Sequence, residues 1–177
     1  MLIQHQIKLI PVSLAKEYAE QPLNWSLKLW GQGKSEFSAD DWRNFYKNAM
    51  NSDYSKFNSD GADQELLFMA IRTTDGAEEV VASIALCDFD DFEEYRQFKP
   101  WIAAFIVRED LRGSGVGSAV LELMEKKIFT YGVKHIYLWT EGEKNFYGKR
   151  GYQLIDQLHK PGRVIDLMQK DLGQQII

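Results

Sequence analysis

The chain has 177 residues, of which 45% are hydrophobic, so it has the length of one domain and enough apolar side chains for a substantial core. Its formal net charge of −5 is uneven, because residues 1–100 carry 10 Lys and Arg against 17 Asp and Glu, whereas residues 101–177 carry 11 against 9. This pattern excludes the strongly basic surface that is typical of nucleic-acid-binding proteins, and we expect no nucleic-acid partner.

The chain contains one cysteine, Cys87, and three His residues that are far apart in the sequence. No internal disulfide can form, and the spacing of Cys and His predicts no zinc site, so we expect no metal. No apolar run approaches the length of a membrane span, and the N-terminal residues lack the apolar core of a signal peptide. We therefore expect a cytoplasmic protein that does not bind membranes.

The region before residue 64 predicts one strand and several helices. Residues 3–10 alternate weakly between apolar and polar side chains, which is typical of a strand. Ser13 can cap a short helix that ends before Pro22, and Asn24 can cap a second helix. Ser38 precedes an acidic first turn, which indicates the N-cap of a third helix.

Aromatic residues are concentrated in these predicted helices. Four residues recur at the i, i+3, i+4 and i+7 spacing of one helix face: Trp42, Phe45, Tyr46 and Ala49. Such a stripe is more typical of a protein core than of a substrate pocket, and the pocket is the alternative. Three Trp residues are candidates for contact with a substrate: Trp25, Trp30 and Trp42.

From residue 64 onward, strands and helices follow one another closely. The runs 65–72 and 80–87 predict two strands joined as a hairpin around Asp75-Gly76. An apolar strand, a helix, a strand, a short helix and a last strand are expected at 101–107, 115–131, 135–140, 141–150 and 164–172. The strand-helix-strand order implies a parallel right-handed crossover, so the predicted fold class is α/β on a mixed sheet.

A glycine-rich segment, Arg112-Gly113-Ser114-Gly115-Val116-Gly117-Ser118, follows the apolar strand and opens a predicted helix. Such a junction presents unpaired backbone N–H groups and the positive end of a helix dipole, which suits a phosphate. The segment lacks the lysine of a Walker phosphate loop, and Ser118 stands where a dinucleotide fingerprint has its third glycine. A Walker phosphate loop is therefore excluded. A small nucleotide-binding oxidoreductase stays an alternative, although little chain is left after this segment for the rest of a dinucleotide fold.

Residues 112–117 match the pattern Arg/Gln-x-x-Gly-x-Gly/Ala, and here the chain resembles the GNAT superfamily of N-acetyltransferases. The run 145–152, Asn-Phe-Tyr-Gly-Lys-Arg-Gly-Tyr, is similar to the family's second signature, an aromatic-Tyr-x-x-x-Gly-aromatic motif. The resemblance covers residues 64–172 as a cofactor-binding core, and residues 1–63 are similar to the variable acceptor region. It implies one domain over 1–177, with a mixed central sheet of about six to seven strands flanked by helices.

The resemblance implies roles on the side of the acetyl donor. In this family, backbone amides of the glycine-rich segment hold the pyrophosphate of acetyl-coenzyme A. Here these residues are Arg112, Gly113, Ser114, Gly115, Val116, Gly117 and Ser118. The backbone of Phe105, Ile106 and Val107 is expected to pair with the pantetheine arm, with one amide near the thioester carbonyl. Tyr147 is expected to protonate the departing thiolate, because a phenol remains protonated at neutral pH.

The acceptor side depends on the acidic run that follows the strand at 80–87. Asp88 and Asp90 are candidates for the base that deprotonates an acceptor amine, and Asp91 is a candidate for attracting a cationic substrate. Thr140 and Glu143 stand where many family members have Asn and Ala. One coenzyme contact that is often assigned to that Asn is therefore left open.

We expect an enzyme that transfers an acetyl group from acetyl-coenzyme A directly to a primary amine in a ternary complex. The sequence leaves the acceptor open among small amines, aminoglycoside-like compounds and protein or peptide amines. The alternative is a non-catalytic acyl-coenzyme A sensor or interaction module of the same fold. The sequence leaves the oligomeric state open, and open strand edges are compatible with a homodimer.

Overall fold

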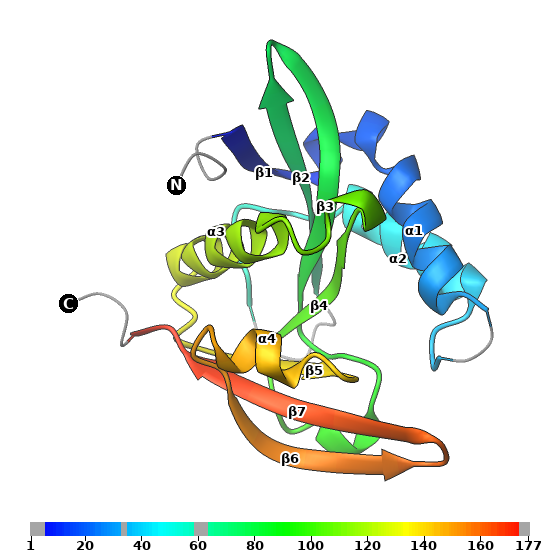
Figure 1. Ribbon diagram of the computed structural model, residues 1–177, viewed down its shortest axis with the longest axis vertical. Helices are drawn as coiled ribbons and strands as arrows, with labels where there is room; N and C mark the ends of the chain where they lie inside the picture. The colour runs from blue at the N-terminus through cyan, green and yellow to red at the C-terminus, as the bar shows by residue number, and fades with distance from the viewer. Residues whose placement is uncertain (1–5, 33–34, 59–63, 174–177) are drawn as a thin grey trace.

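The computed structural model describes residues 6–32, 35–58 and 64–173. At its centre is a seven-stranded sheet in the order β1-β2-β3-β4-β5-β7-β6 (Figure 1). The strands are β1 Ile7–Pro11, β2 Glu65–Thr74, β3 Ala77–Cys87, β4 Trp101–Val107, β5 His135–Thr140, β6 Gln153–Lys160 and β7 Arg163–Asp171. Among these described strands, β4 and β5 form the parallel pair and all other neighbours are antiparallel, which confirms the predicted mixed α/β sheet.

Helices cover both faces of the sheet. α1 (Glu20–Trp30) and α2 (Ala39–Met50) pack on one face, α3 (Val116–Thr130) packs on the other, and the short α4 (Lys144–Gly148) follows β5 (Figure 1). Alternate residues of β2 accordingly enter different cores, with Phe68 in the cluster of α3 and Met69 in the cluster of α2. None of the helices in the described ranges is long and apolar enough to span a membrane.

β4 and β5 separate soon after they begin. In the described chain, the register pair between them is Trp101 with Tyr137. The ladder between β3 and β4 also shifts by one residue between Ser83 and Ala85, and Ala104 in β4 has a φ of +48°. This is a β-bulge, which disrupts the ladder locally and bends the strand. The far halves of the two parallel strands are therefore free to line a cavity.

The predicted pair of helices around Pro22 is wrong. Two short 3-10 turns, Val12–Leu14 and Lys16–Tyr18, precede the single helix α1, in which Pro22 is the third residue. Proline fits there because the N–H groups of a first helical turn have no partner within the helix. Asn24 consequently lies inside α1 and does not cap it.

α2 has the predicted cap and the predicted buried face. The Ser38 Oγ accepts a hydrogen bond from the Asp41 amide at 3.1 Å, and the Asp41 carboxylate accepts one from the Ser38 amide at 2.8 Å. All four residues of the apolar stripe are buried: Trp42, Phe45, Tyr46 and Ala49. This reciprocal cap fixes where α2 begins and therefore which side chains it turns toward the sheet.

The chain after β5 differs from the sequence prediction in two places. The helix expected at 141–150 is limited to α4, and the sequence predicted no strand where β6 lies. Most β6 side chains are exposed, because β6 is an edge strand that pairs with β7 alone, and so no alternation of apolar residues marks it. β1 is the other edge of the sheet, and the oligomeric state stays open.

Candidate active site

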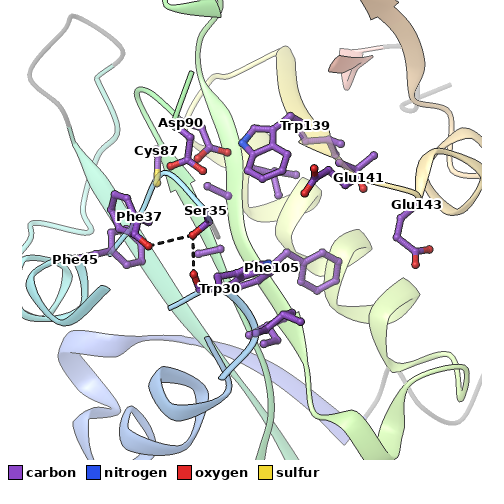
Figure 2. Close-up of a pocket in the computed structure, with 18 of the residues that line it drawn as sticks. Trp30, Ser35, Phe37, Phe45, Cys87, Asp90, Phe105, Trp139, Glu141 and Glu143 are labelled. Carbon is purple, nitrogen blue, oxygen red and sulfur yellow. Dashed lines mark hydrogen bonds between the residues drawn. The ribbon is translucent and has the colours of Figure 1, made fainter. Parts of the chain in front are cut away.

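A cavity of about 510 Å³ lies where β4 and β5 separate. Its lining comes from α1, α2 and the segment between them, from β2 to β5, from the segment after β3, and from α4. Figure 2 shows Phe37 and Phe45 on one side of the cavity and Asp90 near Trp139 at its upper end. The volume is within the range of small-molecule sites, and the cavity joins the predicted acceptor region to the predicted cofactor-binding core.

β4 forms one wall of the cavity through three residues that were predicted to contact the pantetheine arm, Phe105, Ile106 and Val107. They directly follow the bulge at Ala104. Because β5 pairs with β4 at Trp101 in the described chain, the β5-facing edge of residues 105–107 has no strand partner there. An extended ligand can bind to such an edge as an additional strand does.

The glycine-rich segment forms the turn between β4 and α3. Gly113 and Gly115 have φ values of +75° and +92°, which residues with a side chain rarely adopt. The Arg112 Nε donates to the Val107 carbonyl at 3.1 Å and ties the turn to the end of β4. The first i→i−4 hydrogen bond of α3 is donated by Ala119, so the three amides before it have no acceptor within the helix. The turn can therefore bind an anion through its backbone.

The predicted donor residues follow one another from the cavity to the start of α3. Phe105, Ile106, Val107 and Arg112 line the cavity, whereas residues 113–118 lie next to it in the chain and are outside its lining. This arrangement fits a long ligand that has a reactive end in the cavity and an anionic group at the helix N-terminus.

Arg150 is a further cation at the start of α3, and the sequence analysis did not single it out. Its guanidinium donates to the Ser118 Oγ and, at 2.6 Å, to the Phe146 carbonyl. It also lies 3.7 Å from the centre of the Phe146 ring. Arg150 thus adds positive charge where residues of the glycine-rich segment present their amides. Its place in the run 145–152 was the only sequence signal for it.

Tyr147 extends from α4 to the cavity lining. Its ring packs edge-on against Phe146 at 5.0 Å and Tyr152 at 5.6 Å between ring centres. Among the described residues, its hydroxyl has no hydrogen-bond partner. A phenol is protonated at neutral pH at its ordinary pKa, and burial raises the pKa of the Tyr147 phenol further, so the hydroxyl carries a proton.

The three acidic candidates occupy different places. Asp90 and Asp91 line both this cavity and a neighbouring one of about 390 Å³, whereas the fully buried Asp88 lines the neighbouring cavity alone. Burial raises the pKa of the Asp90 carboxyl well above its usual range, and the Asp91 carboxylate adds to the rise. The pKa of Asp91 is raised to about 6 by the surrounding protein and by Glu36, while Arg163 opposes the rise. Of the two predicted bases, Asp90 is the one that faces the main cavity.

Two of the three Trp residues predicted to contact a substrate line the cavity. Trp30 and Trp42 line the cavity and stack on each other with ring centres 5.3 Å apart, whereas Trp25 packs against the core beneath α1 and α2 and is outside the lining. The stripe on α2 is therefore both core and cavity wall, because Trp42 and Phe45 belong to both. Several lining residues carried no signal in the sequence, among them Ser35, Phe37, Phe89 and Trp139.

A sequence profile described as "Acetyltransferase (GNAT) family" matches residues 34–152, which is more than half of the chain. The chain belongs to the GNAT acetyltransferase family. It is therefore an acyltransferase, and this family assignment replaces the oxidoreductase alternative. No curated protein matches the GNAT chain by sequence.

Solved structures of other GNAT proteins share the fold across nearly the whole chain. An aminoglycoside 6'-N-acetyltransferase from Enterococcus faecium is 14% identical, with a TM-score of 0.63 and coverage of 94% of this chain and 96% of that one. A spermidine/spermine N-acetyltransferase from Vibrio cholerae is 12% identical, with a TM-score of 0.63 and coverage of 97% and 96%. An aminoglycoside 6'-N-acetyltransferase complexed with coenzyme A is 14% identical, with a TM-score of 0.63 and coverage of 87% and 90%.

Proposed function

We propose that this protein transfers the acetyl group of acetyl-coenzyme A to a primary amine of a small cationic acceptor, by direct attack in a ternary complex. The observation that carries the proposal is that one cavity contains a protonated phenol, Tyr147, a carboxyl group with a raised pKa, Asp90, and the free edge of β4. These are the acid, the base and the donor-binding strand that such a transfer requires.

The donor side fits a coenzyme A molecule. The amides at the start of α3, together with Arg150, suit the pyrophosphate, and the β4 edge at Phe105, Ile106 and Val107 suits the amide groups of the pantetheine arm. A coenzyme A complex of a structure with the same fold supports this assignment. In this arrangement the thioester lies in the cavity, close to the bulge at Ala104.

The reaction needs two proton movements in the cavity. The acceptor nitrogen forms a bond to the acetyl carbon while the bond between that carbon and the coenzyme sulfur breaks. The Asp90 carboxylate accepts the proton that the amine loses, and the Tyr147 hydroxyl donates a proton to the departing thiolate. A backbone amide after the bulge donates to the oxygen on which negative charge develops.

The structure offers little for a covalent acetyl-enzyme route. Cys87 also lines the cavity, but burial and nearby carboxylates raise the pKa of its thiol well above the usual range. A thiol that stays protonated is a weak nucleophile, since the thiolate is the reactive form. Direct transfer to the amine is therefore the favoured route.

The cavity walls suggest a cationic acceptor. The stacked rings of Trp30 and Trp42 can contact an ammonium group or an alkyl chain, and Asp91 adds negative charge. The aminoglycoside and spermidine acetyltransferases with the same fold support small polar amines as acceptors.

The test is release of free coenzyme A thiol from acetyl-coenzyme A across a panel of polyamines, aminoglycosides and lysine-containing peptides. We expect release that depends on an amine and is greatest with the small polycationic members. Binding of acetyl-coenzyme A without release with any amine would instead favour the sensor alternative. Greatest activity with uncharged amines would contradict the proposed acceptor class.

A further inference from the structure

Arg163, the first residue of β7, contacts carboxylates from two distant segments. Its Nε donates to Glu141 Oε1 at 2.7 Å, and its Nη1 donates to Glu36 Oε1 at 3.0 Å. Arg163, Glu36 and Glu141 have side chains that are 22%, 30% and 39% exposed. Water therefore screens these ion pairs less than it screens a pair at the open surface. We call these three residues the Arg163 cluster.

Glu36 lies between two residues that line the cavity, Ser35 and Phe37. The Ser35 Oγ is 2.6 Å from the Trp30 carbonyl oxygen and 3.0 Å from the Phe37 carbonyl oxygen (Figure 2). The Phe37 ring lies edge-on to Trp42, with 5.3 Å between ring centres. The segment 35–38 therefore has a defined local shape that is set by contacts with α1 and α2.

Those contacts lie on the acceptor side and do not attach the segment to the donor side. In the described ranges, two ion pairs join residues 20–50 to residues beyond 100, Glu36 with Arg163 and Lys28 with Glu109. The side chains of Lys28 and Glu109 are 79% and 75% exposed, and pairs of this kind contribute little. Of these two ion pairs, the one in the Arg163 cluster is thus the less exposed.

We propose that Arg163 is a positioning residue for the acceptor. Its ion pairs hold segment 35–38 against the start of β7 and the end of β5, and so fix the acceptor wall of the cavity. The proposal rests on the proposed acetyl transfer for its kinetic consequence, but its structural consequence does not depend on turnover. Both ion pairs of Arg163 are to Glu36 and Glu141, and the glycine-rich segment makes no ion pair with the cluster in the described chain, so we expect donor binding to be unaffected by loss of Arg163.

The kinetic test compares Arg163→Gln and Glu36→Gln. Each variant is expected to raise the KM for the acceptor amine about fivefold, while the KM for acetyl-coenzyme A stays unchanged. The double variant is expected to be no worse than Arg163→Gln alone, because both changes remove the same contact. Arg163→Lys keeps the charge but loses the planar fork, and should recover part of the affinity.

Lys28→Gln is the matched control, because it also removes a cation that connects the two sides but breaks only the exposed pair. We expect no change in either KM for this variant. Effects of Arg163→Gln and Glu36→Gln that add in the double variant would overturn the proposal. Equal increases in the KM values for amine and acetyl-coenzyme A would also overturn it.

Backbone hydrogen exchange separates this inference from the proposed function. In Arg163→Gln, amides of residues 35–42 are expected to exchange faster than in the parent protein, whereas amides of α3 keep their rates. Faster exchange in a protein that acetylates no amine would support the structural inference and contradict the proposed function. Unchanged exchange at residues 35–42 would overturn the inference, whatever the activity.

Discussion

At the scale of single residues, the two groups that exchange protons in the proposed reaction have pKa values raised by burial. For Tyr147 this keeps the phenol protonated, which suits a proton donor. For Asp90 the same effect, increased by the Asp91 charge, raises the pKa of the carboxyl well above its usual range, which makes its carboxylate a stronger base. The same buried cavity can therefore hold both an acid and a base. The ordinary pKa of a phenol lies far above that of a carboxyl group, so Tyr147 can carry a proton under conditions in which Asp90 has lost its proton.

Replacement of Tyr147 by Phe removes the proton donor and keeps the ring that packs against Phe146 and Tyr152. We expect turnover to fall about 100-fold, since general acid catalysis typically contributes at least that much. The dissociation constant of coenzyme A, measured by calorimetry, should not change. Tyr131→Phe is the control, because this hydroxyl donates to the Tyr54 carbonyl at 2.8 Å and lies outside the cavity lining. Full turnover in the Tyr147 variant would remove it from the mechanism.

The acid limb of the pH profile should report the adjacent carboxyls Asp90 and Asp91. Below the raised pKa the base carries a proton and cannot accept another, so kcat/KM for the amine should fall as pH decreases toward about 6 and below. The groups that act on Asp90 are Asp91 and Glu36, which raise its pKa, and the Trp139 indole, which lowers it. Asp91→Asn removes a negative charge and should therefore shift the limb to lower pH.

The control for this shift is Glu93→Gln, which removes a carboxylate from the same loop at a position 81% exposed and paired with Arg96. Its acid limb should coincide with that of the parent protein. A limb that moves to higher pH in Asp91→Asn would have the wrong sign for loss of a like charge. It would show that Asp91 does not act on the base through its charge.

Among the helices and strands, the sequence predicted the ones whose residue pattern is set by local hydrogen bonds or by burial. The cap at Ser38 and the apolar run of β4 were found because a reciprocal hydrogen bond and burial on both faces leave direct signals. β6 left none, since an exposed edge strand needs no alternation. The bulge at Ala104 also left none, because alanine has no preference for the positive φ that the β3–β4 register imposes.

In the turn between β4 and α3, replacing Gly113 by Ala should leave the fold intact but weaken the binding of acetyl-coenzyme A. Gly113 has a φ of +75° and no atom within 4 Å of an added Cβ, so Gly113→Ala costs about 1–2 kcal/mol of backbone strain without a clash. The methyl group would, however, obstruct a phosphate at the adjoining amides. We expect the KM for acetyl-coenzyme A to increase about tenfold, with an unchanged KM for the amine.

Gly76→Ala is a closely matched control for this change. Gly76 has a φ of +80° and equally open surroundings, but it lies in the turn between β2 and β3. Chemical denaturation should show similar losses of stability for both variants, whereas only the Gly113 variant should lose affinity for acetyl-coenzyme A. An equal rise in KM for both variants would mean that the effect comes from stability alone.

At the scale of the whole molecule, the candidate site depends on contacts between residues that are far apart in the chain. Glu36 and Arg163 are 127 positions apart, and no sequence pattern relates them. The motifs predicted a donor side, because in this family the coenzyme is bound by a local glycine-rich turn. The acceptor wall combines α1, α2, β3 and β5, and only the assembled fold brings Trp30, Asp90 and Trp139 to one cavity.

A buried ion pair between residues far apart in the chain also attaches α3 to the sheet. Glu125 in α3 accepts from Lys170 Nζ of β7 at 2.7 Å and from the Tyr152 hydroxyl at 2.9 Å, and the ion-paired side chains are only 7% and 5% exposed. Glu125→Gln leaves a buried ammonium without its counterion, so unfolding by urea should show a loss of about 3–5 kcal/mol. Glu125→Leu with Lys170→Met removes both charges and should recover most of that loss. A double variant as unstable as Glu125→Gln would show that the ion pair itself, rather than the avoidance of one uncompensated charge, holds α3 against β7.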